Sequence, residues 1–304
     1  MNQRPRPPAR RGSGSPRTSG RRVPTPRPRA GSDPAGIDPH SRAAQHRGLG
    51  GEQIEGRQAV RELLVVGRRR TRQIWMVAGS DPAPILDEIE TIAGERRIPV
   101  LVVTREQLAA VARTEAPQGV LAMADPLVEV DFAALLRPRT TSSASASASA
   151  PRMPYLLAVD GITDPYNLGA LLRSAECAGI TGVVLPRHRS VHVTPTVAKA
   201  SAGAIERLPM AIVGGLPSAV LRVKEANGWV VGLDMDGPSS IYSLGHLHDV
   251  PLMVVIGSEG SGLARLTRER CDVVASIPMR GEIESLNASA AGAIALFELG
   301  RLRA

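Results

Sequence analysis

The sequence predicts an α/β protein with a buried parallel sheet in a large C-terminal domain and a smaller α/β domain before it. Short apolar runs of strand length alternate with segments of helical spacing along most of the 304 residues. Such alternation is typical of parallel sheets, in which helices connect consecutive strands. Residues 155–159 and 252–256 are continuous apolar runs, a pattern expected of strands that are buried on both faces.

The small domain is expected over residues 52–130, and its sheet should be at least partly parallel. Its predicted elements are a helix at 54–66, a strand at 73–77, a helix at 85–92, a strand at 100–103, a helix at 106–111 and a strand at 119–123. A basic cluster, Arg68-Arg69-Arg70, follows the first helix. Nothing in this domain suggests bond-making chemistry. The Ser/Ala-rich segment 137–152 has the composition of a linker and marks the domain boundary.

The large domain is expected over residues 153–304. Its predicted strands are 155–159, 182–185, 209–213, 229–233 and 252–256, and its predicted helices include 168–178, 196–206 and 218–226. Polar and glycine-rich loops follow Val159, Leu233, Ile256 and Ile277. Open parallel sheets bind ligands at the carboxyl ends of their strands. We therefore expect the chemistry to take place in this domain.

The net charge of +8 is concentrated at the N-terminus. Residues 1–50 hold eleven Arg against Asp33 and Asp38, a net +9, so the other 254 residues carry −1. This segment is rich in Arg, Pro, Gly and Ser and has too few large apolar residues to offset its chain entropy by burial. We expect a disordered arm that binds phosphate backbones without sequence preference. A tail that only increases solubility is the alternative.

Cysteine and histidine usage argues against a disulfide-stabilised protein and against a metalloprotein. Cys177 and Cys271 are the only cysteines, and they do not form a CxxC pair, so we expect neither a disulfide framework nor a zinc site. The histidines of the large domain lack companions at metal-ligand spacing, and we expect no metal.

No apolar run approaches 18 residues, and the N-terminus lacks the apolar core of a signal peptide. A reducing cytoplasm is the expected location.

Two segments near the C-terminus carry the polar side chains of interest. Residues 257–262, Gly-Ser-Glu-Gly-Ser-Gly, look like a nucleotide loop but match neither GxGxxG nor a P-loop. Glu259 in this loop would repel a phosphate and tolerate a cationic ligand. Residues 285–287, Ser-Leu-Asn, are expected to open a helix, because Ser and Asn side chains accept the unpaired amides of a first turn. Small residues along that helix would let another backbone approach closely.

Three segments together resemble the SpoU (TrmH-type) RNA ribose 2′-O-methyltransferases. Residues 160–175, Asp-Gly-Ile-Thr-Asp-Pro-Tyr-Asn-Leu-Gly-Ala-Leu-Leu-Arg-Ser-Ala, look like the first motif of that family. Residues 254–263 look like the second motif and 277–289 like the third. The small domain resembles the ribosomal-protein-like substrate-binding domain of two-domain members that methylate guanosine in ribosomal RNA. Tyr166 is a departure, because many members have His there.

The resemblance implies a SPOUT fold, in which a parallel sheet ends in a deep trefoil knot. It implies S-adenosyl-L-methionine as cofactor, RNA as substrate, and a homodimer with the active site at its interface. The implied cofactor-binding residues are Leu233, Gly257, Ile277 and Leu286. The implied catalytic residues are Arg173, Asn167, Glu259, Ser285 and Asn287.

The resemblance assigns Arg173 to the reacting centre, either as the general base or as the group that holds the target phosphate. A guanidinium group with a pKa above about 12 is a poor base. We expect Arg173 to hold the target phosphate and to lower the pKa of the ribose hydroxyl electrostatically.

The expected function is 2′-O-methylation of a ribose, preferably of guanosine, in large-subunit ribosomal RNA. A transfer RNA guanosine methyltransferase, or an RNA-binding protein without methylation activity, is the alternative.

Overall fold

The computed structural model describes residues 48–79, 83–138, 152–188, 191–245, 247, 249–282 and 285–303. Residues 45–304 form one compact unit. The predicted arm lies outside the described residues except for its last three positions. There, Leu49 is buried and Gly50 pairs with Val193, so the packed chain begins before the predicted boundary at residue 50. Most of the predicted linker, residues 139–151, also lies outside the described residues.

The small domain contains a four-stranded sheet with the strand order β1-β4-β2-β3. Strands β2 and β3 are parallel, whereas β4 is antiparallel to both β1 and β2, so the sheet is partly parallel as predicted. The elements are β1 (Gln53–Glu55), α1 (Arg57–Val66), β2 (Thr71–Val77), α2 (Pro84–Glu95), β3 (Val100–Val103), α3 (Arg105–Val111) and β4 (Val120–Ala124).

Strand β1 differs from the prediction, which placed the start of a helix at residue 54. Gly56 has a φ of 94°, a conformation open to glycine, and it separates β1 from α1. The three residues before it pair with β4, and Glu55 is fully buried there. Helix α1 then buries Val60, Leu63 and neighbouring apolar residues at helical spacing.

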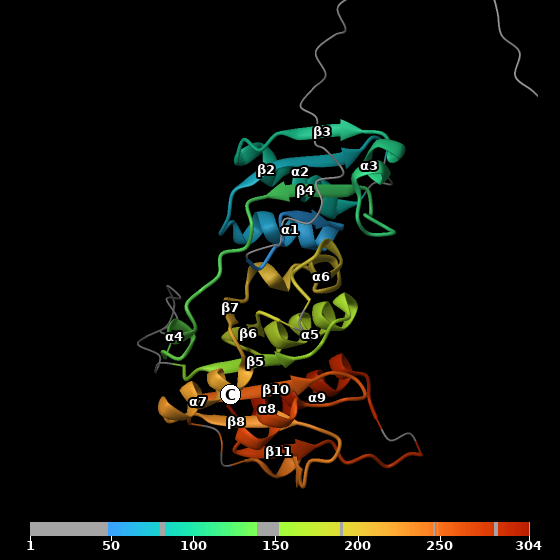
Figure 1. The fold of residues 1–304 in the computed structure, drawn as a ribbon. Coiled ribbons are helices and arrows are strands. Elements are labelled where there is room, and N and C mark those ends of the chain that lie inside the picture. Colours follow the sequence, from blue (N-terminus) through green and yellow to red (C-terminus); the bar gives the residue numbers. More distant parts are fainter. Residues whose placement is uncertain are drawn as a thin grey trace, which may run out of the picture. The chain divides into compact units, whose positions relative to one another are not determined.

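The large domain contains a seven-stranded sheet with the order β7-β6-β5-β10-β8-β11-β9, and all its strand pairs are parallel (Figure 1). The predicted buried parallel sheet is therefore confirmed. Its elements are β5 (Tyr155–Asp160), α5 (Pro165–Cys177), β6 (Gly182–Pro186), α6 (Pro195–Ala200), η1 (Ala204–Glu206), β7 (Met210–Val213), α7 (Leu216–Glu225), β8 (Trp229–Leu233), β9 (Ser239–Ser240), η2 (Ile241–Ser243), β10 (Leu252–Gly257), α8 (Arg265–Arg270), β11 (Val273–Ser276) and α9 (Ala288–Arg301). A short helix, α4 (Phe132–Leu135), precedes them.

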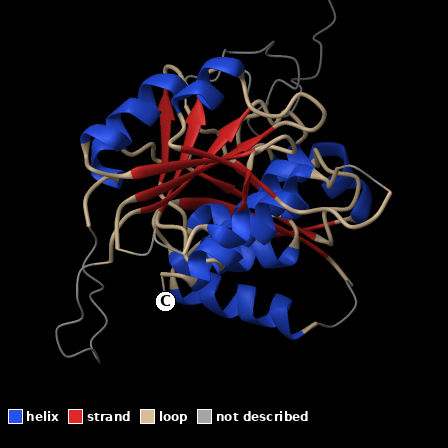
Figure 2. Ribbon diagram, turned by 90° about the horizontal axis from the view of Figure 1, so that it is seen from below, coloured by secondary structure: helices blue, strands red, loops and turns tan. Residues whose placement is uncertain are grey.

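Helices cover both faces of the large sheet (Figure 2). Side chains of β10 alternate between two apolar clusters: Leu252, Val254 and Ile256 pack in the cluster that includes α5 and α9. Met253 and Val255 pack in the cluster that includes α7. Burial on both faces explains why these strands are continuous apolar runs in the sequence.

The segment predicted as one helix at 196–206 is divided. Helix α6 ends at Ala200, and Gly203, with a φ of 84°, precedes the short 3-10 helix η1. Helix α5 begins earlier than predicted, at Pro165, because the Asp164 side chain accepts a hydrogen bond from the Asn167 amide and caps it. Helix α9 begins as predicted, with the Asn287 side chain as its cap.

Candidate active site

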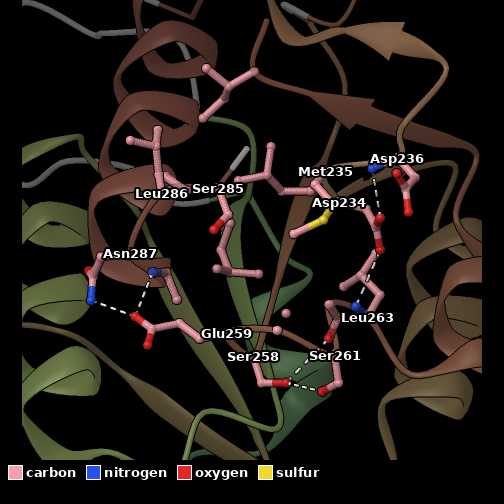
Figure 3. A pocket seen from close by; sticks show the side chains of 18 of the residues that line it. Asp234, Met235, Asp236, Ser258, Glu259, Ser261, Leu263, Ser285, Leu286 and Asn287 are labelled. Carbon is pink, nitrogen blue, oxygen red and sulfur yellow. Dashed lines mark hydrogen bonds between the residues drawn. The ribbon is translucent and has the colours of Figure 1, made fainter. Parts of the chain in front are cut away.

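A cavity of about 810 Å³ lies at the carboxyl ends of β8, β10 and β11 (Figure 3). This volume falls within the range of about 300–1,000 Å³ that is typical of small-molecule sites. The cavity is formed by three loops and by the beginning of α9. Its lining residues are Leu233, Asp234, Met235, Asp236, Ile256, Gly257, Ser258, Glu259, Gly260, Ser261, Gly262, Leu263, Arg265, Arg268, Ile277, Met279, Ser285, Leu286, Asn287, Ala288 and Ala291.

The four predicted cofactor-binding residues all line this cavity. Leu233 ends β8, Gly257 ends β10, Ile277 follows β11, and Leu286 precedes α9. Three of these side chains are aliphatic: one ends β8, and the other two lie at opposite ends of the loop between β11 and α9. The strand order brings them together, since β10 and β11 are the two neighbours of β8.

Gly257 occupies a position where a side chain does not fit. A Cβ atom there would lie 2.4 Å from the carbonyl carbon of Gly262 and 2.7 Å from the amide nitrogen of Leu263. The loop folds back on itself at this point, because Ser258 and Gly262 exchange two backbone hydrogen bonds of 3.1 Å each. The close approach of backbone to backbone shapes one wall of the cavity.

The carboxylate of Asp234 connects the loop after β8 to the loop after β10. Its Oδ1 accepts a hydrogen bond from the Asp236 amide (3.1 Å), and its Oδ2 accepts one from the Leu263 amide (3.4 Å). The Nε atom of Arg268 in α8 lies 3.7 Å from Oδ2. Sequence reasoning missed Asp234; the available signal was a carboxylate immediately after a predicted strand.

Glu259 joins the three motifs at the opposite side of the cavity (Figure 3). Its Oε1 accepts hydrogen bonds from Asn167 Nδ2 (3.1 Å), Asn287 Nδ2 (2.5 Å) and the Ala288 amide (3.1 Å). Asn287 Nδ2 also donates to Asn167 Oδ1 (2.8 Å). Three of the predicted catalytic residues, one from each motif, are therefore in direct contact. A carboxylate at the first turn of α9 also interacts favourably with the helix dipole.

Asn287 both caps α9 and contacts two of the other predicted catalytic residues. Its Oδ1 accepts hydrogen bonds from the Ser289 and Ala290 amides, so one end of the carboxamide caps α9. Its Nδ2 is thereby oriented toward Glu259 and Asn167. Ser285, two residues earlier, also lines the cavity.

Arg173 does not belong to the cavity lining of its own chain. It is exposed on α5, six residues after Asn167, so it lies about 120° around the helix from that residue. The buried side of α5, with Leu168 and Leu172, sets this rotation. Tyr166, seven residues before Arg173, lies on the same exposed face of α5 as Arg173.

Two residues behind the loops support their positions. Asp160, at the end of β5, accepts a hydrogen bond of 2.9 Å from the Ala264 amide at the start of α8. Cys271 lies against Gly232 of β8, where a Cβ atom would approach its sulfur to 2.9 Å. Burial of the Cys271 thiol, together with the neighbouring carboxylates of Asp272 and Asp160, raises its pKa to about 12. This thiol is therefore neutral at physiological pH and packs as an apolar group.

Within the described ranges, no three His, Cys, Asp or Glu side chains cluster as metal ligands. None of the described helices has the length and apolar character needed to cross a membrane.

A parallel sheet with three polar loops around a cavity at its carboxyl edge has the architecture of an α/β enzyme that binds a small molecule at the ends of its strands. The chain belongs to the SpoU rRNA methylase family, whose model matches residues 154–297. A second family model, described as RNA 2′-O ribose methyltransferase substrate binding, matches residues 53–129.

Several relatives are similar over most of their length. A protein of Staphylococcus haemolyticus named as a TrmH family tRNA/rRNA methyltransferase is 36% identical over 251 residues, which cover 82% of this chain and 95% of the relative. The 23S rRNA (guanosine-2′-O-)-methyltransferase RlmB of Pseudomonas putida is 36% identical over 257 residues, covering 83% of this chain and 97% of the relative.

A solved structure shows the same fold. The SpoU methyltransferase AviRb from Streptomyces viridochromogenes, in complex with the cofactor AdoMet, superposes with a TM-score of 0.64 at 22% identity. The match covers 82% of this chain and 89% of that chain. The predicted fold class, an α/β SPOUT methyltransferase domain with a parallel sheet, preceded by a small α/β domain, is therefore confirmed.

Family membership also confirms the predicted class of enzyme, an RNA 2′-O-methyltransferase that uses S-adenosylmethionine. The cavity fits this cofactor in size and in the character of its walls. Apolar side chains, backbone amides and carbonyls, and a few charged groups face it. Gly257 lets the loop after β10 fold back closely on itself at the wall of the cavity.

Proposed function

We propose that this protein transfers a methyl group from S-adenosylmethionine to the ribose 2′-oxygen of a guanosine in large-subunit ribosomal RNA. The observation that carries the proposal is the convergence of Asn167, Glu259 and Asn287 beside the cavity. The similarity to the Pseudomonas putida RlmB protein, whose name specifies a 23S rRNA guanosine, supports this target. The match of the small domain to a substrate-binding family supports a large folded RNA as substrate.

Positioning supplies much of the rate in such a reaction. When bound, S-adenosylmethionine offers an electrophilic methyl group for in-line attack by the ribose oxygen. The protein contributes a fixed geometry, which removes several kcal/mol of entropic cost. Leu233 at the end of β8, and Ile277 and Leu286 at the two ends of the loop between β11 and α9, form apolar walls, and we infer that they hold the cofactor between them.

We infer that Glu259 positions the other catalytic residues. One of its carboxylate oxygens fixes the Asn167 and Asn287 carboxamides and the first amide of α9. Ser285, on the same approach to α9, lines the cavity and is proposed to contact the reacting groups. These residues come from segments that are far apart in the chain, so the geometry depends on the whole large domain.

Arg173 is proposed to bind the phosphate next to the reacting ribose. A guanidinium group can form two parallel hydrogen bonds with a phosphate, and its positive charge favours the ionised 2′-oxygen. Because Arg173 is exposed and lies outside the cavity of its own chain, we infer that it acts on the cavity of a second copy.

An exposed apolar stripe supports a homodimer. Ile294 and Phe297 of α9 are 37% and 51% exposed, and Tyr166 of α5 is 60% exposed. Helices α5 and α9 pack against each other, so these side chains lie on neighbouring helices. Large exposed apolar side chains on adjacent helices are typical of a protein interface. A second copy seated here would meet the helix that carries Arg173.

Mixing two impaired variants tests the shared site, at an S-adenosylmethionine concentration that saturates the wild-type cavity but not that of Gly257→Ala. Arg173→Ala keeps an intact cavity but lacks the guanidinium, and Gly257→Ala keeps Arg173 but has a distorted cavity. If Arg173 acts across the interface, mixed dimers regain one working site and RNA methylation reappears on mixing. If each chain uses its own Arg173, no mixed dimer has a working site and activity stays absent.

Mapping 2′-O-methyl groups in cellular RNA with and without this gene tests the target. Loss of one large-subunit ribosomal guanosine modification is the expected result. Loss of a transfer RNA modification would favour the second candidate, and no change would favour an RNA-binding protein without methylation activity. The domain division at 52–130 and 153–304, the RNA-binding arm, a role in ribosomal RNA processing and the cytoplasmic location remain parts of the proposal.

A further inference from the structure

A buried ion pair connects the small domain to the large domain. Arg69 Nε and Nη2 donate to the two carboxylate oxygens of Glu206, at 3.0 and 2.5 Å. The two side chains are only 3% and 2% exposed. Arg69 lies between α1 and β2 of the small domain, whereas Glu206 lies in η1 of the large domain. Arg69 Nη1 donates to the carbonyl oxygens of Gly51 and Asp125, so the guanidinium is held from both sides.

Other contacts surround this pair. Arg207 forms an ion pair with Glu62 of α1 at 2.6 Å, and Arg68 Nη1 donates to the Arg207 carbonyl at 2.9 Å. Gly203 lies so close to α1 that a Cβ atom there would be 2.5 Å from the Glu62 Cβ and 3.2 Å from the Ala59 Cα. The backbones of the two domains thus approach to a distance that only glycine permits.

Backbone hydrogen bonds fix the chain on both sides of the small domain. The Val193 amide donates to the Leu49 carbonyl just before the domain begins (2.9 Å). The Val130 amide, where the domain ends, donates to the Met210 carbonyl of β7 (2.9 Å). Both ends of the small domain are therefore hydrogen-bonded to the large domain.

The contact between the two domains extends through α6 to α5, the helix that carries two of the predicted catalytic residues. Helix α6 contacts β1 and packs on α5, and Figure 1 shows α1, α6 and α5 in succession between the two sheets. The packing of α5 on α6 is close, because a Cβ atom at Gly169 would lie 2.4 Å from the Ala200 Cβ. Helix α5 carries both Asn167 and Arg173.

We propose that the Arg69–Glu206 pair is a positioning device that holds the small domain at one fixed distance and orientation from α5. RNA anchored on the small domain then presents one particular nucleotide to the cavity, so the junction contributes to the choice of methylation site. A buried fork-shaped pair suits this role, because its geometry is directional whereas apolar contacts are not. This inference rests on the proposed RNA methylation.

Glu206→Gln tests the pair from the large-domain side. It preserves side-chain shape and leaves the bonds of Arg69 within the small domain intact, but it removes the charge that Arg69 faces. Glu88→Gln is the matched control, because Glu88 pairs with Arg61 (2.7 Å) at the surface within the small domain. Arg69→Lys, which keeps the charge but loses the fork, is the second variant if Glu206→Gln does not fold.

Three measurements are made on the full chain. In Glu206→Gln, hydrogen exchange at the Val130 and Val193 amides should accelerate at least tenfold. With ribosomal RNA, kcat/KM should fall at least tenfold while kcat changes less than threefold, and methylation should appear at neighbouring nucleotides. Affinity for S-adenosylhomocysteine should stay within twofold.

Equal exchange rates and equal methylation patterns in Glu206→Gln and Glu88→Gln would overturn the inference. A fall in kcat and cofactor affinity without a change in KM would also overturn it, because the pair would then only stabilise the large domain. The exchange measurement needs no RNA. If the wild-type protein does not methylate ribosomal RNA, the proposed target is wrong, but the exchange rates in Glu206→Gln still test the role of the ion pair.

Discussion

Gly257→Ala should strongly weaken cofactor binding, because it adds a methyl group where the loop after β10 has no room for one. The added Cβ would lie 2.4–2.7 Å from backbone atoms of Gly262 and Leu263, and these atoms cannot move without opening the loop. Overpacking of this kind costs about 1–3 kcal/mol. Opening the loop also removes the two backbone hydrogen bonds between Ser258 and Gly262, each contributing about 1 kcal/mol.

Together these effects amount to about 3–5 kcal/mol, since the loop must close again for the cofactor to bind. Each 1.4 kcal/mol is about a tenfold change in Kd, so affinity should fall by about 100-fold or more. Calorimetric titration of the purified protein measures this directly. The wild-type protein should bind S-adenosylmethionine and S-adenosylhomocysteine, and it should not bind NAD or ATP.

Gly281→Ala is the matched control, because an added Cβ there meets no atom within 4 Å. Its affinity should stay within threefold of wild type. The reasoning is refuted if Gly257→Ala binds S-adenosylhomocysteine as tightly as Gly281→Ala, or if its circular dichroism shows global unfolding.

Three further predictions concern separate parts of the chain. Arg173→Ala should abolish methyl transfer in single-turnover assays, and Arg173→Lys should restore little of it, while the affinity for the cofactor changes less than about tenfold in both variants. Near-wild-type transfer by the Lys variant would rule out the bidentate role of Arg173. Removal of residues 1–46 should leave cofactor binding unchanged but weaken RNA binding and its salt dependence, and equal RNA affinity at several salt concentrations would show a solubilising tail. Iodoacetamide at pH 8 should modify the exposed Cys177 first, because a pKa of about 12 leaves only about 10⁻⁴ of Cys271 as thiolate, and labelling of Cys271 at an equal rate would contradict its burial.

The elements that the sequence predicts well are those with a single dominant physical cause. Continuous apolar runs identify β5, β6, β8 and β10 because both faces of these strands are buried. Strands β1 and β9 have three and two residues, too few for any periodic pattern. Helix α8, Arg-Leu-Thr-Arg-Glu-Arg, buries little apolar surface and lacks a helical apolar stripe.

The sequence predicts which residues come together where position along the chain determines position in space. Residues at or next to the carboxyl ends of neighbouring parallel strands must lie at one edge, and Leu233, Gly257 and Ile277 do so. The placement of Arg173 depends instead on how α5 rotates against α6 and α9, which a local pattern does not reveal. Asp234 was missed because its role, joining two loops, exists only after both loops are in place.

The three-way junction at Glu259 has a consequence for the time at which the enzyme becomes active. Asn167 and Asn287 are 120 residues apart in the chain, so their contact requires a large loop to close. Chains are synthesised from the N-terminus, and domains fold as they emerge. Asn287 is synthesised after strands β5 to β11, so these strands can pair before Asn287 is available, but the contact among Asn167, Glu259 and Asn287 cannot form until then. A growing chain can thus complete the sheet that lines the cavity before the residues at Glu259 come together.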